Sequence, residues 1–235
     1  GMASVFTATF ILLTLLFFTP LFYYLPNAVL AAIVIAAVID LVDIKAAITL
    51  FSLKRSSGVS LVLTFVVTLG FGIETGVLSG VLFTLLVFIW RSAHPHAAEL
   101  GYVNPGIGFR NIDRYPGATT YPGVLILRVD ASLYFANMAF LEDLLRRSVH
   151  EKEELQWILM DFSGVNDIDG CAVQSLEQLM RAYRETGIRF ALAAVKGPVR
   201  DVLKRSSWPD LLGAHMEYAS VQQALNHILA TQAQT

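Results

Sequence analysis

The most polar segment between two apolar runs is the stretch from Asp161 to Gly170, whose sequence is DFSGVNDIDG. It follows the apolar run 157–162, which predicts a buried strand, and it precedes a predicted helix. In folds that alternate strands and helices, ligands bind at the carboxyl ends of strands, where the amide groups of helix N-termini attract anions. We therefore expect a ligand-binding or regulatory loop made of Asp161, Asn166, Asp167, Asp169, Gly170 and Cys171.

Calcium is the first ligand to test against this acidic loop. A calcium loop needs oxygen ligands at fixed offsets before its glycine and a glutamate at its end. Counting back from Gly170 places Val165 at the first ligand position and Leu176 at the position of the final glutamate. The sequence therefore excludes calcium. The simpler interpretation of Asp169 is a helix N-terminal charge or cap, and that of Cys171 is an ordinary small, half-buried residue.

Motifs of enzymes and metal sites are absent from the sequence. It contains no GxGxxG, no phosphate loop and no GxSxG elbow. His94 and His96 have no third ligand nearby in the sequence, so we interpret them as part of a solvated linker. The single cysteine excludes an intrachain disulfide and a cysteine-based metal cage. We expect no catalysis, no cofactor and no bound metal.

The charged residues are distributed very unevenly. Val5 to Leu25 contains no charge, and roughly 20 apolar residues at about 1.5 Å of rise each cross a bilayer core. Only six charged residues precede Arg91: Asp40, Asp43, Lys45, Lys54, Arg55 and Glu74. The formal net charge of the chain is −2, without a basic stripe, which excludes nucleic acid as a partner. The sequence predicts a membrane part followed by a water-soluble part.

Further segments of the membrane part follow from the same pattern. Residues 27–42 form a second apolar segment, and Asp43 to Arg55 has the pattern of an amphipathic helix at the membrane surface, although a solvated helix would look similar. Ser57 to Arg91 is too long for one crossing, so we expect two short crossings with a turn near Glu74. Together these segments predict about four short transmembrane helices.

Three glycines and one glutamate stand out near that turn. Gly72, Gly76 and Gly80 are spaced by four, which places them on one helix face and favours close packing of a neighbouring helix. The alternative is that they are hinges of a moving gate. Glu74 is interpreted as a hydrated charge at a helix end, with a transport-related proton carrier as the alternative.

Basic residues predict the orientation. Lys45, Lys54 and Arg55 lie between the second and third segments, and Arg91 follows the fourth, so both places are expected in the cytoplasm. The amino terminus is then cytoplasmic as well.

After Arg91 the pattern changes to strands that alternate with amphipathic helices. The predicted strands are a pair, 107–112 and 123–130, then 157–162, 189–195 and a short 216–218. The predicted helices are 136–150, 171–186 closed by Gly187, a short one from Pro198, and one from Ser220 through about 231. This order predicts an α/β fold with a mixed, largely parallel sheet covered by helices.

Several motifs resemble one family when they are taken together. They are the run 25–35 (LPNAVLAAIVI), Gly72 to Gly76 (GIETG), Arg91 to His96 (RSAHPH) and Phe109 to Ile112 (FRNI). These resemble the carboxyl-terminal part of sulfate permease (SulP) anion transporters, and Val165 to Asp169 (VNDID) looks like the signature of their STAS domain. The motifs occur in the family's order.

The resemblance implies a secondary-active transporter of inorganic anions such as sulfate or bicarbonate, with the STAS domain regulating or assembling it. The expected domains are residues 1–92 for the transmembrane helices, 93–121 for a linker and the first STAS strand, and 122–235 for the cytoplasmic STAS domain. The resemblance further implies the bacterial inner membrane, a homodimer, an inorganic anion bound by the full-length protein and a cytoplasmic protein partner.

The sequence departs from the family in two ways. The family has two inverted repeats with the anion held between broken half-helices, whereas this chain supplies about four segments, which implies that most of the anion site is missing. In antagonist-type STAS domains a phosphorylatable Ser or Thr follows the signature aspartate, but here Gly170 and Cys171 follow Asp169. The rival hypothesis is a membrane-tethered STAS module that binds a protein or a nucleotide without transport.

Overall fold

The structure is a computed structural model that describes residues 2–22, 26–39, 43–152 and 154–233. It divides into two units, Gly1–Thr84 and Leu85–Thr235, and each is described here by itself.

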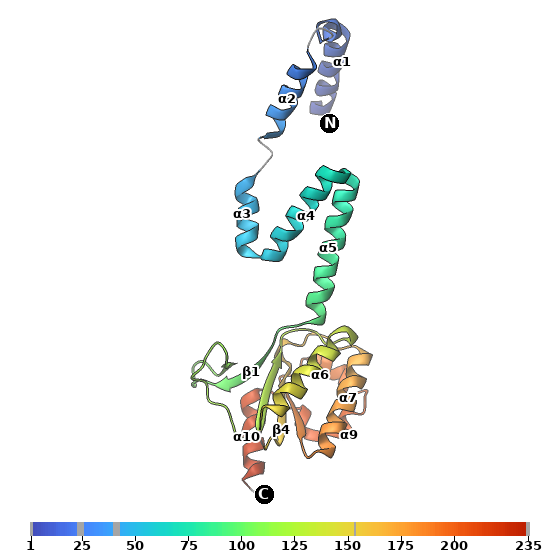
Figure 1. The fold of residues 1–235 in the computed structure, drawn as a ribbon. Helices are drawn as coiled ribbons and strands as arrows, with labels where there is room; N and C mark the ends of the chain where they lie inside the picture. Colours follow the sequence, from blue (N-terminus) through green and yellow to red (C-terminus); the bar gives the residue numbers. More distant parts are fainter. Residues whose placement is uncertain (1, 23–25, 40–42, 153, 234–235) are drawn as a thin grey trace. The chain divides into compact units, whose positions relative to one another are not determined.

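The first unit is helical (Figure 1). Its helices are α1 (Met2–Phe22), α2 (Asn27–Ile39), α3 (Ile44–Leu53), α4 (Arg55–Phe71) and α5 (Ile73–Ala93), the last of which continues into the second unit. Of the described residues, α1 and α5 are long and apolar enough to cross a membrane, and α2, α3 and α4 are shorter apolar helices. The ends of the first two predicted segments, 23–25 and 40–42, lie outside the described residues.

The amphipathic segment after residue 42 forms a helix, as predicted. Asp43 caps α3, because its Oδ1 accepts a hydrogen bond of 2.9 Å from the backbone N–H of Ala46. A single residue, Lys54, separates α3 from α4, and Gly58 of α4 is buried against the ring of Phe51. The position of α3 on a membrane surface stays a prediction.

The predicted break near Glu74 is confirmed. Gly72 ends α4 with a φ of +93°, a conformation that side chains other than glycine rarely adopt. Helix α5 begins at the next residue, and Glu74 lies in its first turn, where a carboxylate interacts favourably with the helix dipole.

The second unit contains one mixed sheet in the order β2-β1-β3-β4-β5. Its strands are β1 (Ala97–Tyr102), β2 (Phe109–Asn111), β3 (Val124–Val129), β4 (Trp157–Asp161) and β5 (Arg189–Ala193). Strands β3, β4 and β5 are parallel, whereas β1 pairs antiparallel with both β2 and β3. The mixed α/β fold class predicted from the sequence is confirmed.

Two predictions about strands were wrong. The segments 107–112 and 123–130 do not pair with each other, because β1, which the sequence placed in the linker, lies between β2 and β3. Strand β1 belongs to the sheet because Ala98 and Leu100 are buried. The segment 216–218 is not a strand: Tyr218 forms one isolated bridge with Ala193, and Met216 is the last residue of the 3-10 helix η2 (Gly213–Met216).

Helices cover both faces of the sheet (Figure 1). They are α6 (Phe135–His150), α7 (Gly170–Glu185), α8 (Gly197–Leu203), α9 (Trp208–Leu212) and α10 (Val221–Gln232), with a short 3-10 turn η1 (Phe162–Gly164). Alternate strand residues form two cores: Leu127 and Ile158 pack with Leu176 of α7 in one, and Leu159 packs with Ile228 of α10 in the other. This alternation fixes the register of the strands, because a shift by one residue would exchange the two faces.

Candidate functional site

The loop predicted as a site follows β4, and its first residue is firmly held. Asp161 is 7% exposed, and its Oδ1 accepts a hydrogen bond of 2.9 Å from the backbone N–H of Ser163. A Cβ on Gly164 would lie 2.8 Å from the Cα of Asp130, so only glycine allows the loop to approach the end of β3 this closely. The hydrogen bond of Asp161 and the close approach at Gly164 therefore fix the path of the loop after β4.

The middle of the loop is joined to the segment before α6. Leu133 donates its backbone N–H to the carbonyl of Asp167 at 3.0 Å and accepts from the N–H of Asp169 at 3.0 Å. The Asp169 carboxylate accepts from the N–H of Ala172 at 2.7 Å and from the N–H of Phe135 at 3.1 Å. Asp169 thus caps α7, as the sequence suggested, and also holds the start of α6.

The outer side of the loop is accessible. Asn166 accepts a hydrogen bond of 2.6 Å from the Nζ of Lys196, and a Cβ at Gly170 would meet no atom within 4 Å. Cys171 is exposed, so the expectation of a half-buried residue was wrong. Phe135, the first residue of α6, is 73% exposed. The structure therefore places Asn166, Asp167, Gly170 and Cys171 on one exposed loop, with Asp161 buried beneath it. Among the residues that it describes, it shows no cluster of three metal-ligating side chains.

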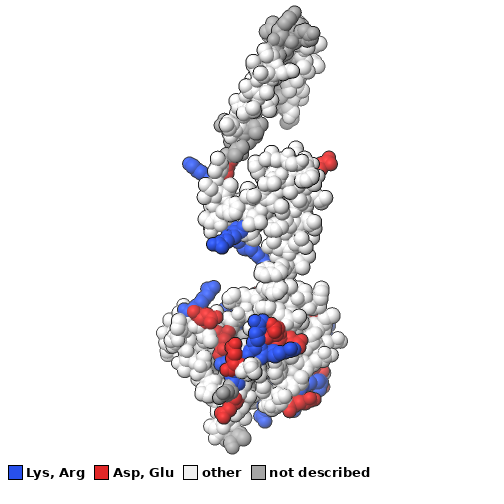
Figure 2. Space-filling model, viewed as in Figure 1, with Lys and Arg blue, Asp and Glu red and all other residues white. Residues whose placement is uncertain are grey.

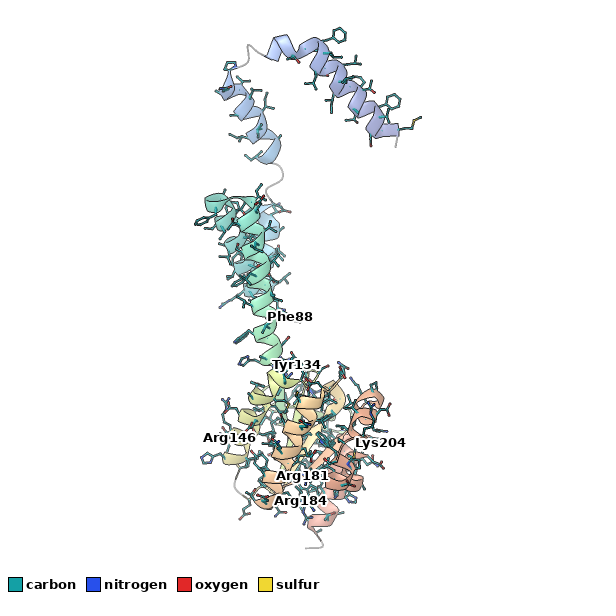
Figure 3. The ribbon with its side chains drawn as sticks, turned by 90° about the vertical axis from the view of Figure 1, so that its right-hand side faces the viewer. Phe88, Tyr134, Arg146, Arg181, Arg184 and Lys204 are labelled. Carbon is teal, nitrogen blue, oxygen red and sulfur yellow. The ribbon has the colours of Figure 1, made fainter. Side chains whose placement is uncertain are left out.

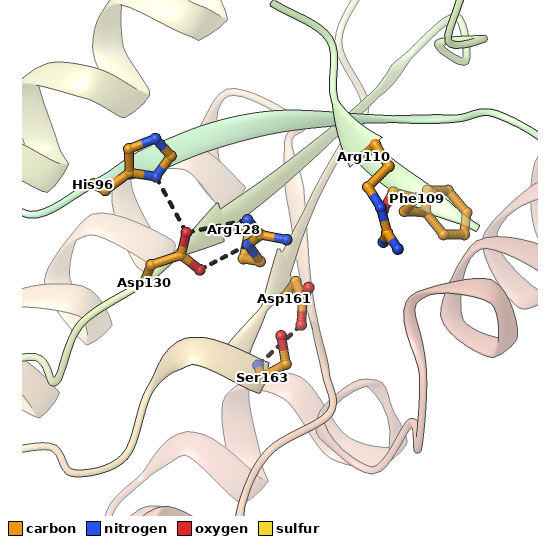
Figure 4. A network of polar contacts seen from close by, with 7 residues as sticks. All are labelled: His96, Phe109, Arg110, Arg128, Asp130, Asp161 and Ser163. Atoms are coloured by element: carbon orange, nitrogen blue, oxygen red, sulfur yellow. Dashed lines mark hydrogen bonds and ion pairs between the residues drawn. The ribbon is translucent and has the colours of Figure 1, made fainter. Parts of the chain in front are cut away.

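A second polar cluster escaped the sequence analysis. A cavity of about 450 Å³ beside β2 is lined by His96, Arg110, Asn111, Arg114, Tyr115, Arg128 and Asp130. Asp130 joins two of them (Figure 4): its Oδ1 lies 2.7 Å from Arg128 Nε and its Oδ2 lies 3.1 Å from His96 Nδ1. His94 turns instead to the Trp90 carbonyl, at 3.0 Å, so the two histidines do not share a ligand site. The only sequence signal was the pair of arginines around one short strand.

A third cluster lies at the amino ends of β4 and β5, away from Asp161. A cavity of about 390 Å³ is lined there by Trp157, Met180, Arg184, Gly187, Arg189, Phe190, Leu211, Leu212 and His215. The guanidinium of Arg189 lies 5.6 Å from the ring centre of Trp157. The ring of His215 packs edge-on against the Trp157 ring, with 5.1 Å between the ring centres. Burial first, then the charges of His227 and Arg189, lower the pKa of His215.

In the first unit, α4 and α5 form a close helix pair. A Cβ on Gly76 would overlap the side chain of Thr68, and one on Gly80 would overlap that of Thr64. Ser60 and Thr84 are hydrogen-bonded across the same pair at 3.1 Å. Two of the three predicted packing glycines therefore lie at a helix contact. Gly72 does not share this face, because it forms the turn and a Cβ there would meet no atom within 4 Å.

The comparison with protein families gives two matches. Residues 1–67 match the sulfate permease family, and residues 115–224 match the STAS domain. The first match runs from α1 through most of α4, and the second runs from the turn before β3 into the start of α10.

Among curated proteins, the chain is 36% identical over 96% of its length to "Sulfate transporter 4.1, chloroplastic" of Arabidopsis thaliana. It is 35% identical to "Sulfate transporter 1.2" of the same plant and 31% identical to "High affinity sulfate transporter 2" of Stylosanthes hamata, again over 96% of its length. The chain covers 34%, 36% and 35% of these three proteins, about a third of each.

Among solved structures, the chain resembles the murine Solute Carrier 26 family member A9 anion transporter in the inward-facing state. The TM-score is 0.68 at 21% identity, over 77% of this chain and 30% of that one. At this level of identity the likeness shows the fold.

Proposed function

Because the chain belongs to the sulfate permease family and carries a STAS domain, we propose that it forms part of a secondary-active transporter of inorganic anions of the sulfate or bicarbonate type. The observation that carries this proposal is the match over 96% of the chain, through both the helical and the STAS parts, to proteins named as sulfate transporters. The chain is an integral membrane protein and not an enzyme.

We propose a division of labour between the two parts. In transporters built from repeats, the substrate lies near the bilayer midplane between half-helices whose positive ends face an anion. The basic residues near the apolar helices of this chain, Lys45, Lys54, Arg55 and Arg91, all fall at helix ends or beside them. We infer that the first unit contributes packed gate-type helices and that the anion site needs further segments of the full-length protein.

The STAS domain is proposed to regulate or assemble the transporter through its loop 161–171. Two features support this role: Asp169 holds the loop in place, and Phe135 and Cys171 are exposed beside it. The loop offers a protein partner an apolar anchor within a polar rim, which is a common arrangement at interfaces. The rival, a tethered module that only binds a protein or a nucleotide, has no comparable support.

The proposal includes the bacterial inner membrane, a homodimer and a cytoplasmic STAS domain. The orientation is supported by the basic residues between α2 and α4 and at the end of α5. Figure 2 shows that charged side chains gather on the second unit, whereas the faces of α4 and α5 are mostly uncharged. Cysteine labelling from outside in a Cys171→Ala background is expected to reach position 74 and not position 54.

Sulfate uptake by cells tests the proposal. The full-length protein, expressed in a host that lacks its own sulfate uptake, is expected to give saturable accumulation of radioactive sulfate. Correct membrane insertion without accumulation of sulfate, bicarbonate or another inorganic anion would contradict the proposal and favour the tethered module.

A further inference from the structure

Three arginines line one cavity of the second unit. Arg110 lies on β2, Arg114 follows in the turn after it, and Arg128 lies on β3. The antiparallel pairing of β1 with both β2 and β3 brings them together. Asn111 and Tyr115 complete the wall with an amide and a phenol, both of which can donate hydrogen bonds. Figure 4 shows the side chains of Arg110 on β2 and Arg128 on β3.

The cavity carries an excess of positive charge. Three guanidinium groups line it against one carboxylate, that of Asp130. Asp130 is already engaged by Arg128, with Nη2 at 3.1 Å from Oδ2, and by His96. Among the residues that the structure describes, Arg110 and Arg114 form no ion pair, and Arg110 donates only to the neighbouring Phe109 carbonyl, at 2.8 Å.

Arg128 is held at the wall of the cavity by its ion pair with Asp130. The Nε of Arg128 is buried and makes no hydrogen bond, although it lies 2.7 Å from the Asp130 carboxylate, because the direction of the N–H does not suit one. Asp161 is the register partner of Arg128 on β4, and its Oδ1 accepts a hydrogen bond from the backbone N–H of Ser163. Because the Nε of Arg128 is buried against Asp130, the guanidinium groups that remain open to a ligand in the cavity are those of Arg110 and Arg114.

We propose that this arginine cavity binds a tetrahedral oxyanion with two negative charges, namely sulfate or phosphate. The planar fork of a guanidinium donates two parallel hydrogen bonds to two oxygens of one such group, which a spherical ion such as chloride cannot accept in that way. The excess of two positive charges in the lining matches the two charges of the oxyanion. The cavity, at about 450 Å³, leaves room for water or for the rest of a phosphorylated molecule.

The oxyanion can come from two sources. His96 follows the last residue of α5, Ala93, by three positions, so the cavity is close in sequence to the end of an apolar helix. A free anion of the cytoplasm and the phosphate of an anionic lipid head group share the required chemistry. The site goes beyond the proposed transport, because it belongs to the STAS domain and its test measures binding, not flux.

The test uses the 235-residue chain in nanodiscs of zwitterionic lipid, with radioactive sulfate and inorganic phosphate as probes in equilibrium dialysis. The double variant Arg110→Ala, Arg114→Ala is expected to bind sulfate at least about tenfold more weakly, since each lost charge-assisted contact is worth about that factor. The double variant Arg110→Lys, Arg114→Lys keeps the charge but removes the planar guanidinium groups. Its sulfate affinity should lie between that of the unaltered chain and that of the double alanine variant.

The matched control is Arg146→Ala with Arg181→Ala, which removes the same charge from exposed i,i+4 ion pairs on α6 and α7 (Figure 3). Unchanged sulfate affinity in the control, together with loss in the Arg110 and Arg114 variant, supports the site. An equal loss of sulfate affinity in both double variants would mean that only the net charge matters, and it would overturn the proposed site. Absence of saturable binding of both sulfate and phosphate to the unaltered chain would overturn it as well.

A second arm identifies the source. Nanodiscs that contain phosphatidate are compared with nanodiscs that contain phosphatidylglycerol at the same surface charge. If a lipid head group occupies the cavity, phosphatidate will weaken sulfate binding more than phosphatidylglycerol does, and the difference will vanish in the Arg110→Ala, Arg114→Ala variant. If the two lipids act alike while sulfate binding still depends on both arginines, the natural ligand is the free anion.

Discussion

Asp169 is the residue on which the loop after β4 most depends, because one carboxylate caps α7 and holds the start of α6. Replacing it with alanine removes both hydrogen bonds, and we expect the free energy of unfolding to fall by about 1–3 kcal/mol. Asp169→Asn keeps a good cap for α7 and should lose less. Urea unfolding of the full chain, followed by Trp157 and Trp208 fluorescence, measures both. Equal stability of Asp169→Ala and the unaltered chain would contradict this role.

His215 makes the stability of the second unit depend on pH. In the unfolded chain its pKa is about 6.5, whereas burial and the charges of His227 and Arg189 lower it in the folded protein. Below about pH 6.5 the unfolded state therefore binds the proton more readily, and the free energy of unfolding falls as the pH decreases. Arg184 also lines the cavity and adds positive charge there.

The check is the slope of stability against pH between about 6.5 and 5. His215→Gln should flatten this slope, while His150→Gln, which changes an exposed histidine at the end of α6, should leave it as it is. The same slope in both variants would show that other groups cause the pH dependence.

The helix pair α4–α5 depends on close approach at two glycines. A leucine at position 76 would meet the Thr68 backbone, where a Cβ already lies 2.8 Å from its Cα. We expect Gly76→Leu to destabilise the pair by about 1–3 kcal/mol or more, as overpacking does. Gly70→Leu is the control, because a Cβ there meets no atom within 4 Å. Thermal unfolding in detergent should separate the two variants, with the STAS transition unchanged in both; identical behaviour would refute the packing role.

Strand β1 bears on the predicted domain boundary at residue 122. It pairs with both β2 and β3 and buries Ala98 and Leu100, so a chain of residues 122–235 would leave one edge of β3 unpaired. We propose that residues 94–235 fold alone and expect residues 122–235 to be less stable by about 2–5 kcal/mol, the usual cost of losing large buried side chains. Denaturant titration of both fragments tests this, and equal midpoints would restore the boundary at 122.

The elements with strong periodicity were predictable from the sequence. The helices α6 and α7 and the strand β4 were placed within a residue or two, because their apolar residues follow one regular period. Strand β1 was missed, since Ala97–Tyr102 is short and contains no β-branched residue. The cavity of Arg110, Arg114 and Arg128 was missed because only the strand order brings these residues together.

For the whole molecule, two chemically different parts follow one another in one chain. The helices of the first unit expose large apolar side chains such as Phe10 and Phe65, which requires a lipid or protein environment around them. The second unit has its own buried cores on both faces of a sheet. The matches to the sulfate permease family and to the STAS domain account for both parts, and the anion transport that we propose would unite them.

Sulfate flux into proteoliposomes tests that central claim most directly. The full-length protein that contains these residues is compared with the 235-residue chain at equal protein density, and uptake of radioactive sulfate and bicarbonate is measured against concentration. We predict saturable flux for the full-length protein and none for the 235 residues alone, because the chain covers only about a third of the sulfate transporters it matches, and repeat-built transporters hold the anion between half-helices of both repeats. Saturable flux by the 235 residues alone would contradict the inference of an incomplete anion site, and absence of anion flux by the full-length protein would contradict the transporter itself.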